Sequence, residues 1–239
     1  MKLKRMKLSV IMPVYNEKDT ILEIIRRVKA VKLPKEIMII DDFSKDGTRD
    51  ILKKIKDKEI KVFFHERNYG KGHALRTGIS HATGDIIIIQ DADLEYDPQD
   101  YLKLVEPIEK GETKVVYGTR FPKKPGHPSL STPYYSLFNK FYFANKILTM
   151  TANILFGANI TDEPTCYKIF HSDVFKNINL KCERFEFCPE VTAKVKKKGY
   201  KILEVPISYH PRSVEEGKKI KWKDGLEAIW ALIKYRFVD

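Results

Sequence analysis

Apolar residues follow two alternating periods along the first half of the chain. Short apolar runs, mostly β-branched and typical of strands buried on both faces, occur at residues 8–14, 36–40, 60–64 and 85–90. Between them the apolar residues recur at helical spacing, which predicts helices over residues 19–32, 48–56 and 72–82. This alternation predicts an α/β fold with a Rossmann-like, mostly parallel central sheet and helices on both of its faces.

The second half is patterned differently. A helix is expected near residues 98–109 and a strand at 114–117, and residues 121–133, rich in Pro, Gly and Lys, predict a loop. Residues 134–156 are dense in aromatic and aliphatic side chains, but Lys140 and Lys146 argue against a membrane-spanning helix. The segment is therefore expected to be either a buried core helix or a helix lying in a membrane interface.

Residues 220–237 interleave cations with tryptophans and aliphatic residues. A helix of this composition either packs onto the domain or docks at an anionic lipid surface. The sequence contains no internal repeat, and its length allows one large domain. We therefore expect a single domain over residues 1–239, with C-terminal helices added to the sheet.

Composition narrows the class of partner. The 44 basic and 32 acidic residues give a net charge of +12, which suits a polyanion such as nucleic acid, an anionic lipid surface or a phosphorylated substrate. Nucleic acid is disfavoured because the aromatic residues cluster in apolar helices rather than on a basic strand face. Three cysteines without a Cys-x-x-Cys pair indicate a reducing compartment. Neither a signal-peptide core nor a window of 18 uncharged apolar residues is found, so no transmembrane helix is expected.

An acidic triplet, Asp91-Ala92-Asp93, follows the most apolar predicted strand. Because side chains alternate along an extended chain, Asp91 and Asp93 point the same way and could bind a divalent cation. The carboxyl ends of such strands are also where ligands bind in open α/β sheets. Taken alone, the triplet fits a solvated acidic turn equally well.

Polar loops also follow the other three predicted strands, at residues 13–17, 41–48 and 67–72.

Several enzyme classes are excluded because the sequence lacks their motifs. Leu75 stands where the third glycine of a dinucleotide fingerprint belongs, and there is no P-loop, no zinc-binding His-Glu-x-x-His and no Gly-x-Ser-x-Gly elbow.

These loops resemble those of family-2 glycosyltransferases with the GT-A fold. The resemblance rests on Pro-Val-Tyr-Asn-Glu at 13–17, Ile-Ile-Asp-Asp at 39–42, Asn68 with Gly-Lys-Gly at 70–72, and the acidic triplet. Later segments are similar to the polyprenyl-phosphate branch, which contains dolichyl-phosphate mannose and glucose synthases. They are Gly-Thr-Arg at 118–120, Thr-Asp at 161–162, Cys-Tyr-Lys at 166–168, Glu-Val-Pro-Ile at 204–207, and Arg212 with Gly-Lys-Lys at 217–219.

The resemblance implies a metal-dependent enzyme that moves a hexose, with inversion, from a UDP- or GDP-hexose to a polyprenyl (dolichyl) phosphate. Residues 1–119 would bind the donor through Pro13, Tyr15, Glu17, Asp41, Asp42, Lys71, Asp91 and Ala92. Mg²⁺ or Mn²⁺ would be held by Asp91 and Asp93, with Glu95 completing the shell. Residues 120–239 would bind the acceptor phosphate through Arg120, Lys168, Arg212 and Lys218. Asp91, Asp93, Arg120 and Arg212 would form the catalytic set.

The chain departs from the family pattern at two positions. Phe43 replaces the usual glycine after the paired aspartates, and Pro164 stands where close relatives often carry Glu, so that role is lost or passes to Glu163. A phosphate acceptor is largely dianionic at neutral pH and needs no general base. The alternative acceptor, a saccharide hydroxyl, would need one, and Asp162 or Glu163 is the candidate.

Several points stay open at this stage. The sequence does not choose between GDP-mannose, UDP-glucose and UDP-N-acetylglucosamine as donor. The large C-terminal transmembrane extension of some relatives is missing from this sequence, so membrane attachment is expected through an amphipathic surface or a membrane protein partner. We expect the protein to be cytoplasmic and peripheral, on the cytoplasmic face of a membrane.

Overall fold

The computed structural model describes residues 5–121, 140–212 and 222–238. Its strands are β1 (Leu8–Val14), β2 (Lys35–Asp41), β3 (Ile60–Phe64), β4 (Ile86–Ile89), β5 (Val115–Thr119), β6 (Lys168–His171) and β7 (Ile202–Pro206). Its helices are α1 (Ile21–Ala30), α2 (Thr48–Lys53), α3 (Lys71–His81), a 3₁₀ turn η1 (Pro98–Asp100), α4 (Tyr101–Glu109), α5 (Lys140–Phe156), α6 (Asp173–Asn177), α7 (Phe187–Lys197) and α8 (Trp222–Phe237).

The described strands form one sheet in the order β3-β2-β1-β4-β6-β5-β7. All neighbours pair in parallel except β6, which runs antiparallel to both β4 and β5. The predicted mostly parallel sheet is therefore confirmed, and the predicted helices and strands up to residue 119 are found within a few residues of their expected bounds. The sequence analysis did not assign β6, α6, α7 or β7.

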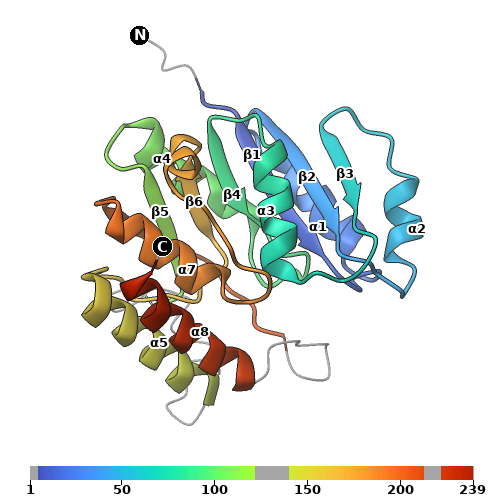
Figure 1. The fold of residues 1–239 in the computed structure, drawn as a ribbon. Helices are drawn as coiled ribbons and strands as arrows, with labels where there is room; N and C mark the ends of the chain where they lie inside the picture. The colour runs from blue at the N-terminus through green and yellow to red at the C-terminus, as the bar shows by residue number, and fades with distance from the viewer. Residues whose placement is uncertain (1–4, 122–139, 213–221, 239) are drawn as a thin grey trace.

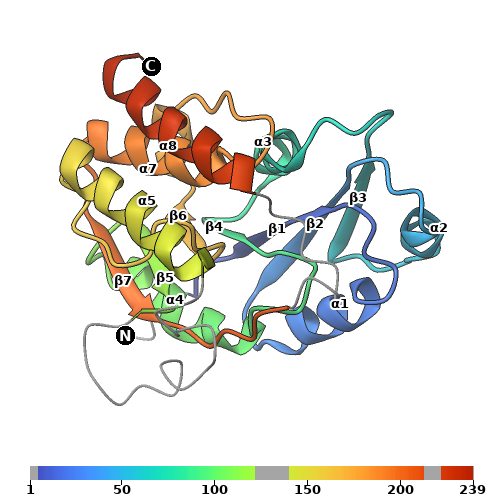
Figure 2. The same ribbon diagram turned by 90° about the horizontal axis from the view of Figure 1, so that it is seen from below.

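Helices cover both faces of the sheet, as predicted (Figures 1 and 2). On one face α3 packs against β1 and β2, and α7 is joined to β5 by a 3.0 Å hydrogen bond between the Tyr117 and Thr192 hydroxyls. On the other face α4 packs against β5 and β6. The α3 contact is close at Gly78, where a Cβ would lie 2.4 Å from Cγ2 of Ile11, so any larger residue would push the helix off the sheet.

Helices α5 and α8 pack against each other and against α7, outside the sheet (Figures 1 and 2). Leu148 and Ala152 of α5 and Leu232 of α8 are buried in this contact. The other side of each helix exposes apolar residues. The expected packing onto the domain is therefore found on one side of these helices, and the expected contact with a membrane interface or anionic lipid surface stays a prediction. Residues 134–139 of the aromatic segment, residues 122–133 of the expected loop, and residues 220 and 221 lie outside the described residues. Among the described residues, no helix combines the length and apolarity needed to cross a bilayer.

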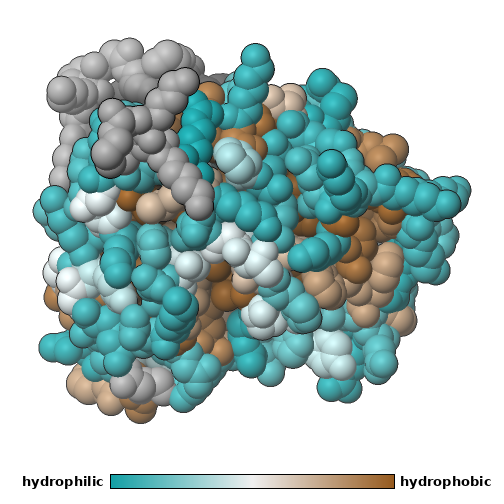
Figure 3. All heavy atoms as spheres, turned by 90° about the horizontal axis from the view of Figure 1, so that it is seen from above, coloured by the Kyte–Doolittle hydropathy of each residue, from teal (hydrophilic) through white to brown (hydrophobic). Residues whose placement is uncertain are grey.

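At the amino ends of the strands, a buried carboxylate ties three segments together. Glu36 of β2 accepts hydrogen bonds from the Ser9 hydroxyl of β1 and from the Thr83 backbone, both at 2.7 Å. The surface seen from this end is mostly hydrophilic, with smaller hydrophobic patches between the polar residues (Figure 3). The large pocket lies at the opposite, carboxyl end of the strands.

Candidate active site

A pocket of about 1090 Å³ lies where β1, β2 and β4 end. The loops after these strands form one side of it, and α5, α8 and the segment before α7 form the other. The predicted donor, metal and acceptor residues that line it are Pro13, Tyr15, Glu17, Asp42, Lys71, Asp91, Ala92, Asp93, Glu95, Arg120 and Arg212, and the candidate base Glu163 lines it as well. The structure thus brings together most of the residues expected to carry the chemistry.

Asp91 is paired with a lysine from α3. The Lys71 ammonium lies 2.7 Å from one oxygen of the Asp91 carboxylate and 2.8 Å from the other. Burial alone would lower the pKa of Lys71, but the Asp91 carboxylate outweighs burial and raises it. The lysine is therefore charged and fixed at the rim of the pocket.

Asp93 is paired with Arg212, a residue far along the chain. The guanidinium lies 3.3 Å from Oδ2 of Asp93 and 3.3 Å from Oε2 of Glu17. Burial raises the pKa of Asp93 to about 7, and the nearby Asp91 and Glu95 carboxylates add to this rise, against the effect of Arg212. Negative charge is crowded at this point, so an added cation would be stabilised here.

Backbone strain is concentrated in the same loops. Among the described residues, four other than glycine have positive φ angles, and three of them, Asn16 (52°), Phe43 (66°) and Leu94 (64°), lie in loops around the pocket. Phe43 therefore keeps the left-handed turn that a glycine would adopt easily. Such strain persists only where the surroundings enforce it, and it is typical of functional sites.

Glu95, predicted to complete the metal shell, is already hydrogen-bonded to residues that follow β7. Oε1 of Glu95 accepts a hydrogen bond from the Arg212 backbone at 2.8 Å, and Oε2 accepts one from the Tyr209 hydroxyl at 2.9 Å. Both oxygens thus hold residues 209–212 in place. No group of three His, Cys, Asp or Glu residues arranged for a metal is found in the part of the chain that the structure describes. Asp91 and Asp93 remain as the pair whose oxygens, charge crowding and pocket position suit a divalent ion.

Asp42 organises the loop that leads into α3. It accepts hydrogen bonds from the backbone of Tyr69 at 2.9 Å and of Gly70 at 2.7 Å, and it contacts the His65 ring at 2.7 Å. Gly70 has a φ of 97°, and a Cβ there would lie 2.4 Å from the Glu183 carbonyl oxygen. Only glycine therefore fits where the segment before α7 crosses this loop.

Arg120 lines the pocket but is held from behind by Asp162. Its Nε and Nη2 each lie 2.8 Å from a carboxylate oxygen of Asp162, and both side chains are buried. The guanidinium also lies 4.8 Å from the centre of the Tyr209 ring. Because its bidentate bond is made to Asp162, Arg120 is fixed in orientation, and Asp162 is engaged rather than open as a general base.

Two predicted residues are not brought to the pocket, and a third is not described. Lys168 is fully buried on β6, where its ammonium donates to the carbonyl oxygens of Glu163 and Thr165 and lies 4.0 Å from the Tyr117 ring centre. Asp41 is fully buried and paired with Arg49 at 3.4 Å. Lys218 lies outside the described residues. The expected phosphate contact of Lys168 and donor contact of Asp41 are therefore not supported. Each side chain is fully buried and already bonded to groups inside the protein.

The sequence analysis missed an entire wall of the pocket. Segment 183–189, together with Asn145 of α5 and Asp224 of α8, lines the side opposite the strand loops. Glycines at positions 70 and 72 were the available signal, because such residues often mark the close approach of another backbone. They do not reveal which segment approaches.

Comparisons with known proteins show the family to which the chain belongs. The model of the family described as glycosyl transferase family 2 matches residues 9–178. The chain is 29% identical over 236 residues to a dolichol-phosphate mannosyltransferase from Pyrococcus furiosus, covering 96% of this chain and 64% of that protein. It is 28% identical over 218 residues to a dodecaprenyl-phosphate galacturonate synthase from Rhizobium johnstonii, covering 87% of this chain and 60% of that protein. The chain thus spans less than two thirds of the length of these curated relatives.

Solved structures share the fold. Glucosyl-3-phosphoglycerate synthase from Mycobacterium tuberculosis, in complex with Mn²⁺, UDP and phosphoglyceric acid, superposes with a TM-score of 0.72 at 16% identity, covering 98% of this chain and 80% of that chain. The same protein with Mg²⁺ and UDP gives a TM-score of 0.71 at 17% identity, covering 98% of this chain and 80% of that chain. At such identity the likeness concerns the fold, and the expected GT-A fold is confirmed.

Proposed function

Because the chain belongs to glycosyl transferase family 2, we propose that it moves a hexose from a nucleotide diphosphate sugar to a polyprenyl (dolichyl) phosphate. One observation carries the proposal. A single pocket combines an acidic pair with three cations from distant parts of the chain, Lys71, Arg120 and Arg212. Such a pocket suits the joining of two phosphate-bearing substrates. Both curated relatives named above carry a polyprenyl or dolichyl phosphate in their names.

The donor would lie against the loops that follow β1, β2 and β4. Pro13, Tyr15, Glu17 and Asp42 line this side of the pocket, with Lys71 placed for the diphosphate. Asp91 and Asp93 would hold Mg²⁺ or Mn²⁺, which when bound supplies Lewis-acid stabilisation of charge on the leaving diphosphate. Lys71 adds a fixed positive charge at the same place, so the chain itself stabilises the leaving group.

The acceptor would be a phosphate rather than a hydroxyl. A phosphate monoester is largely dianionic at neutral pH, so it attacks without a general base. Of the two carboxyls considered as bases, Asp162 is engaged by Arg120. Glu163 lines the pocket and burial raises its pKa, so a hydroxyl acceptor would have to rely on this carboxyl, whereas a phosphate acceptor needs neither. Arg120 and Arg212 would position the acceptor phosphate by charge and hydrogen bonding.

The lipid chain of such an acceptor requires access to a membrane. Helix α5 exposes Phe143, Ile147, Met150 and Ile154, and α8 exposes Leu226, Trp230, Ile233 and Phe237. Each set follows the same helical spacing along one face, and Lys146, Lys223, Lys234 and Arg236 are exposed beside them. Aromatic and aliphatic side chains flanked by cations suit the interface of an anionic bilayer. We therefore propose peripheral attachment by α5 and α8, on the cytoplasmic face, with or without a membrane protein partner.

A two-way substrate panel tests this function. The protein is incubated with Mn²⁺ and each of GDP-mannose, UDP-glucose and UDP-N-acetylglucosamine, with either a short polyprenyl phosphate or free oligosaccharides as acceptor. We expect product only with the polyprenyl phosphate. Transfer to oligosaccharides alone would replace our proposal with the saccharide-acceptor alternative, and the productive donor identifies the sugar.

A further inference from the structure

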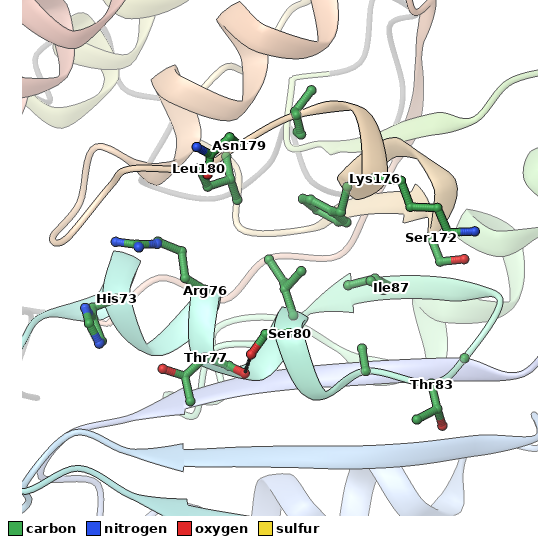
Figure 4. A pocket seen from close by; sticks show the side chains of 15 residues that line it. His73, Arg76, Thr77, Ser80, Thr83, Ile87, Ser172, Lys176, Asn179 and Leu180 are labelled. Carbon is green, nitrogen blue, oxygen red and sulfur yellow. Dashed lines mark hydrogen bonds between the residues drawn. The ribbon is translucent and has the colours of Figure 1, made fainter. Parts of the chain in front are cut away.

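A second groove lies on the face of the sheet covered by α3, away from the pocket described above. It has a volume of about 670 Å³ and shares no lining residue with that pocket. One wall is α3, the other is the segment that runs from α6 toward α7, and Gly84 and Ile87 form the floor beside β4 (Figure 4). Its volume lies in the range of pockets that hold small organic ligands, roughly 300–1,000 Å³.

The lining of this groove favours an anion. Its fifteen residues include Arg76, Lys176 and His73 but no aspartate or glutamate. The Ser172 hydroxyl and the Asn179 amide add hydrogen-bonding capacity. The hydroxyls of the other three polar residues are already hydrogen-bonded within the protein, Thr77 to His65, Ser80 to the Thr77 carbonyl and Thr83 to Glu36. Apolar side chains make up most of the remainder, among them Phe175, Ile178 and Leu180. The groove therefore offers positive charge and polar groups beside an apolar surface.

Arg76 is the central feature. Its side chain is half-buried, and no hydrogen bond or ion pair of Arg76 is found within residues 5–121, 140–212 and 222–238. Lys176, by contrast, is paired with Asp173 at 2.6 Å. In Figure 4 the Arg76 side chain lies between His73 on its own helix and Asn179 and Leu180 on the opposite wall, whereas Lys176 lies at the other end near Ser172. A guanidinium in such a place can make bidentate hydrogen bonds to an oxyanion.

The neighbours of Arg76 do not supply that oxyanion. Burial lowers the pKa of His73, the nearby His65 and Arg76 lower it further, and the Asp42 and Glu183 carboxylates offset only part of this, so the ring adds hydrogen-bonding capacity rather than positive charge. The Asn179 carbonyl accepts from Lys194 of α7, and the Cys182 backbone donates to Glu190 at 2.6 Å. The wall that faces Arg76 is thus held firmly by α7, which preorganises the groove.

We propose that this groove is a binding site for a small organic phosphate, with its phosphate on Arg76 and its carbon skeleton on Phe175, Ile178 and Leu180. The proposal does not depend on the function assigned to the larger pocket, because the residues differ and the readout is binding. A phosphate monoester matches the groove because it joins a compact dianion to an apolar body.

Phenyl phosphate is a suitable probe, with inorganic phosphate and phenol as its separate halves. Binding is followed by ¹H–¹⁵N chemical-shift changes of the full chain. We expect saturable shifts in amides of residues 76–83 and 172–180, stronger binding by phenyl phosphate than by inorganic phosphate, and no comparable binding by phenol. Shifts confined to the pocket of Asp91 and Arg212, or no saturable shifts at all, would overturn the proposal.

Charge variants of exposed positions complete the test. Arg76→Gln should weaken phenyl phosphate binding about tenfold or more, as expected for loss of a charged hydrogen-bonding partner. Ser80→Asp places a carboxylate one helical turn from Arg76 and should weaken binding similarly, whereas Ser80→Ala should not. Lys54→Gln, which removes an exposed cation just after α2, controls for net charge. Equal affinity of the Arg76→Gln, Ser80→Asp and Lys54→Gln proteins would refute the site.

Discussion

The Lys71 ammonium contacts both carboxylate oxygens of Asp91, at 2.7 Å from one and 2.8 Å from the other. The second carboxylate of the triplet, Asp93, is paired instead with Arg212. Each acidic side chain thus has its own cation, and the two cations come from distant parts of the chain. Under our proposal these cations lie where the phosphates of donor and acceptor meet, and the acidic pair between them provides the site for a divalent ion.

The first prediction concerns Asp93. Asp93→Asn removes one carboxylate of the pair and keeps its shape, so we expect transfer to fall about 10²–10³-fold, as when a group that stabilises transition-state charge is lost. A second readout is the stabilisation of the protein by nucleoside diphosphate, measured as a melting-temperature rise with and without Mn²⁺. We expect Mn²⁺ to enhance this rise in the natural protein and not in the variant.

Asp97→Asn is the matched control. Asp97 lies four residues further on and accepts a hydrogen bond from the Gln99 backbone, a cap that asparagine also provides. We expect this variant to keep transfer and the Mn²⁺ effect. An Asp93→Asn protein with the transfer rate of the Asp97→Asn control would remove Asp93 from the chemistry.

The second prediction separates the two pocket arginines. Arg120→Ala leaves the fully buried Asp162 without its partner, which should cost about 3–5 kcal/mol of unfolding free energy. Arg212→Ala breaks looser contacts at a less buried position, so we expect a cost of about 1 kcal/mol, with a larger effect on use of the polyprenyl phosphate. Urea denaturation measures the loss of stability in each variant, and kinetics with varied polyprenyl phosphate measure the effect on use of the acceptor.

A double variant tests whether the unpaired charge of Asp162 causes the loss of stability in Arg120→Ala. Removing Asp162 as well eliminates the uncompensated charge, so the Arg120→Ala/Asp162→Ala protein should be less destabilised than the sum of the two single variants. Additive losses would mean that the ion pair is not what makes Arg120 important to stability.

The third prediction concerns the crossing of Gly70 and Glu183. Gly70→Ala places a Cβ 2.4 Å from the Glu183 carbonyl and should displace the segment that walls the pocket, lowering both stability and nucleotide affinity. Gly111→Ala is a fair comparison because Gly111 also has a positive φ, 73°, but nothing lies within 4 Å of its Cβ position. Both variants share the left-handed strain, and only the first has the clash. Loss of nucleotide affinity in both proteins, or in neither, would contradict the assigned contact.

The elements up to residue 119 were predictable because their apolar residues follow the pattern of a strand or of a helix. β1 and β4 are short apolar runs buried on both faces, and helix α1 buries Ile21, Ile24, Ile25 and Val28 at helical spacing, which leaves few alternatives. β6 was missed because it is only four residues long and begins with Lys168, a residue normally exposed. α7 was missed because it buries Glu190, Thr192 and Lys194, whose polar groups are satisfied by a Glu190–Lys194 pair within the helix and by contacts with other segments.

The site was predictable to the extent that strand ends determine it. Asp91 and Asp93 follow from β4, and their place at the carboxyl end of the sheet follows from its topology. The partners of Glu95 come from far along the chain, since Tyr209 and Arg212 donate hydrogen bonds to its two oxygens. Lys168 bonds to the carbonyls of Glu163 and Thr165, which are near it in sequence, but its full burial depends on the folded sheet. Local spacing carries no information on distant partners or on such burial, so these contacts could not be predicted from the sequence.

The fourth prediction concerns the acid dependence of stability. Burial of Glu36 would raise its pKa, but hydrogen bonds from Ser9, Thr83 and Lys7 outweigh burial and lower the pKa from 4.5 to about 2. Because the folded state binds this proton less readily than the unfolded state, Glu36 contributes stability above pH of about 4.5 that is lost as the pH falls toward about 2. Glu36→Gln should therefore be less stable at pH 7 and show a flatter loss of stability on acidification.

Urea denaturation between pH 7 and pH 3 measures this slope, and Glu112→Gln, at an exposed position, is the control. We expect the control to follow the natural protein across the range. An unchanged slope in Glu36→Gln would mean that another carboxylate dominates the acid dependence.

The last prediction tests the membrane surface of α5 and α8 with two leucines of equal exposure. Leu226 of α8 and Leu22 of α1 are each 57% exposed, but only Leu226 belongs to the apolar face beside Trp230. Leu226→Glu should weaken sedimentation with vesicles that contain anionic lipid. An aliphatic group that would enter the bilayer is replaced by a negative charge that the anionic lipid repels. Leu22→Glu makes the same chemical change on another helix and should leave sedimentation unchanged. Since neither side chain is in the core, both proteins should unfold at nearly the same urea concentration. Equal vesicle binding by the two variants would exclude this face as the membrane contact, whatever the acceptor proves to be.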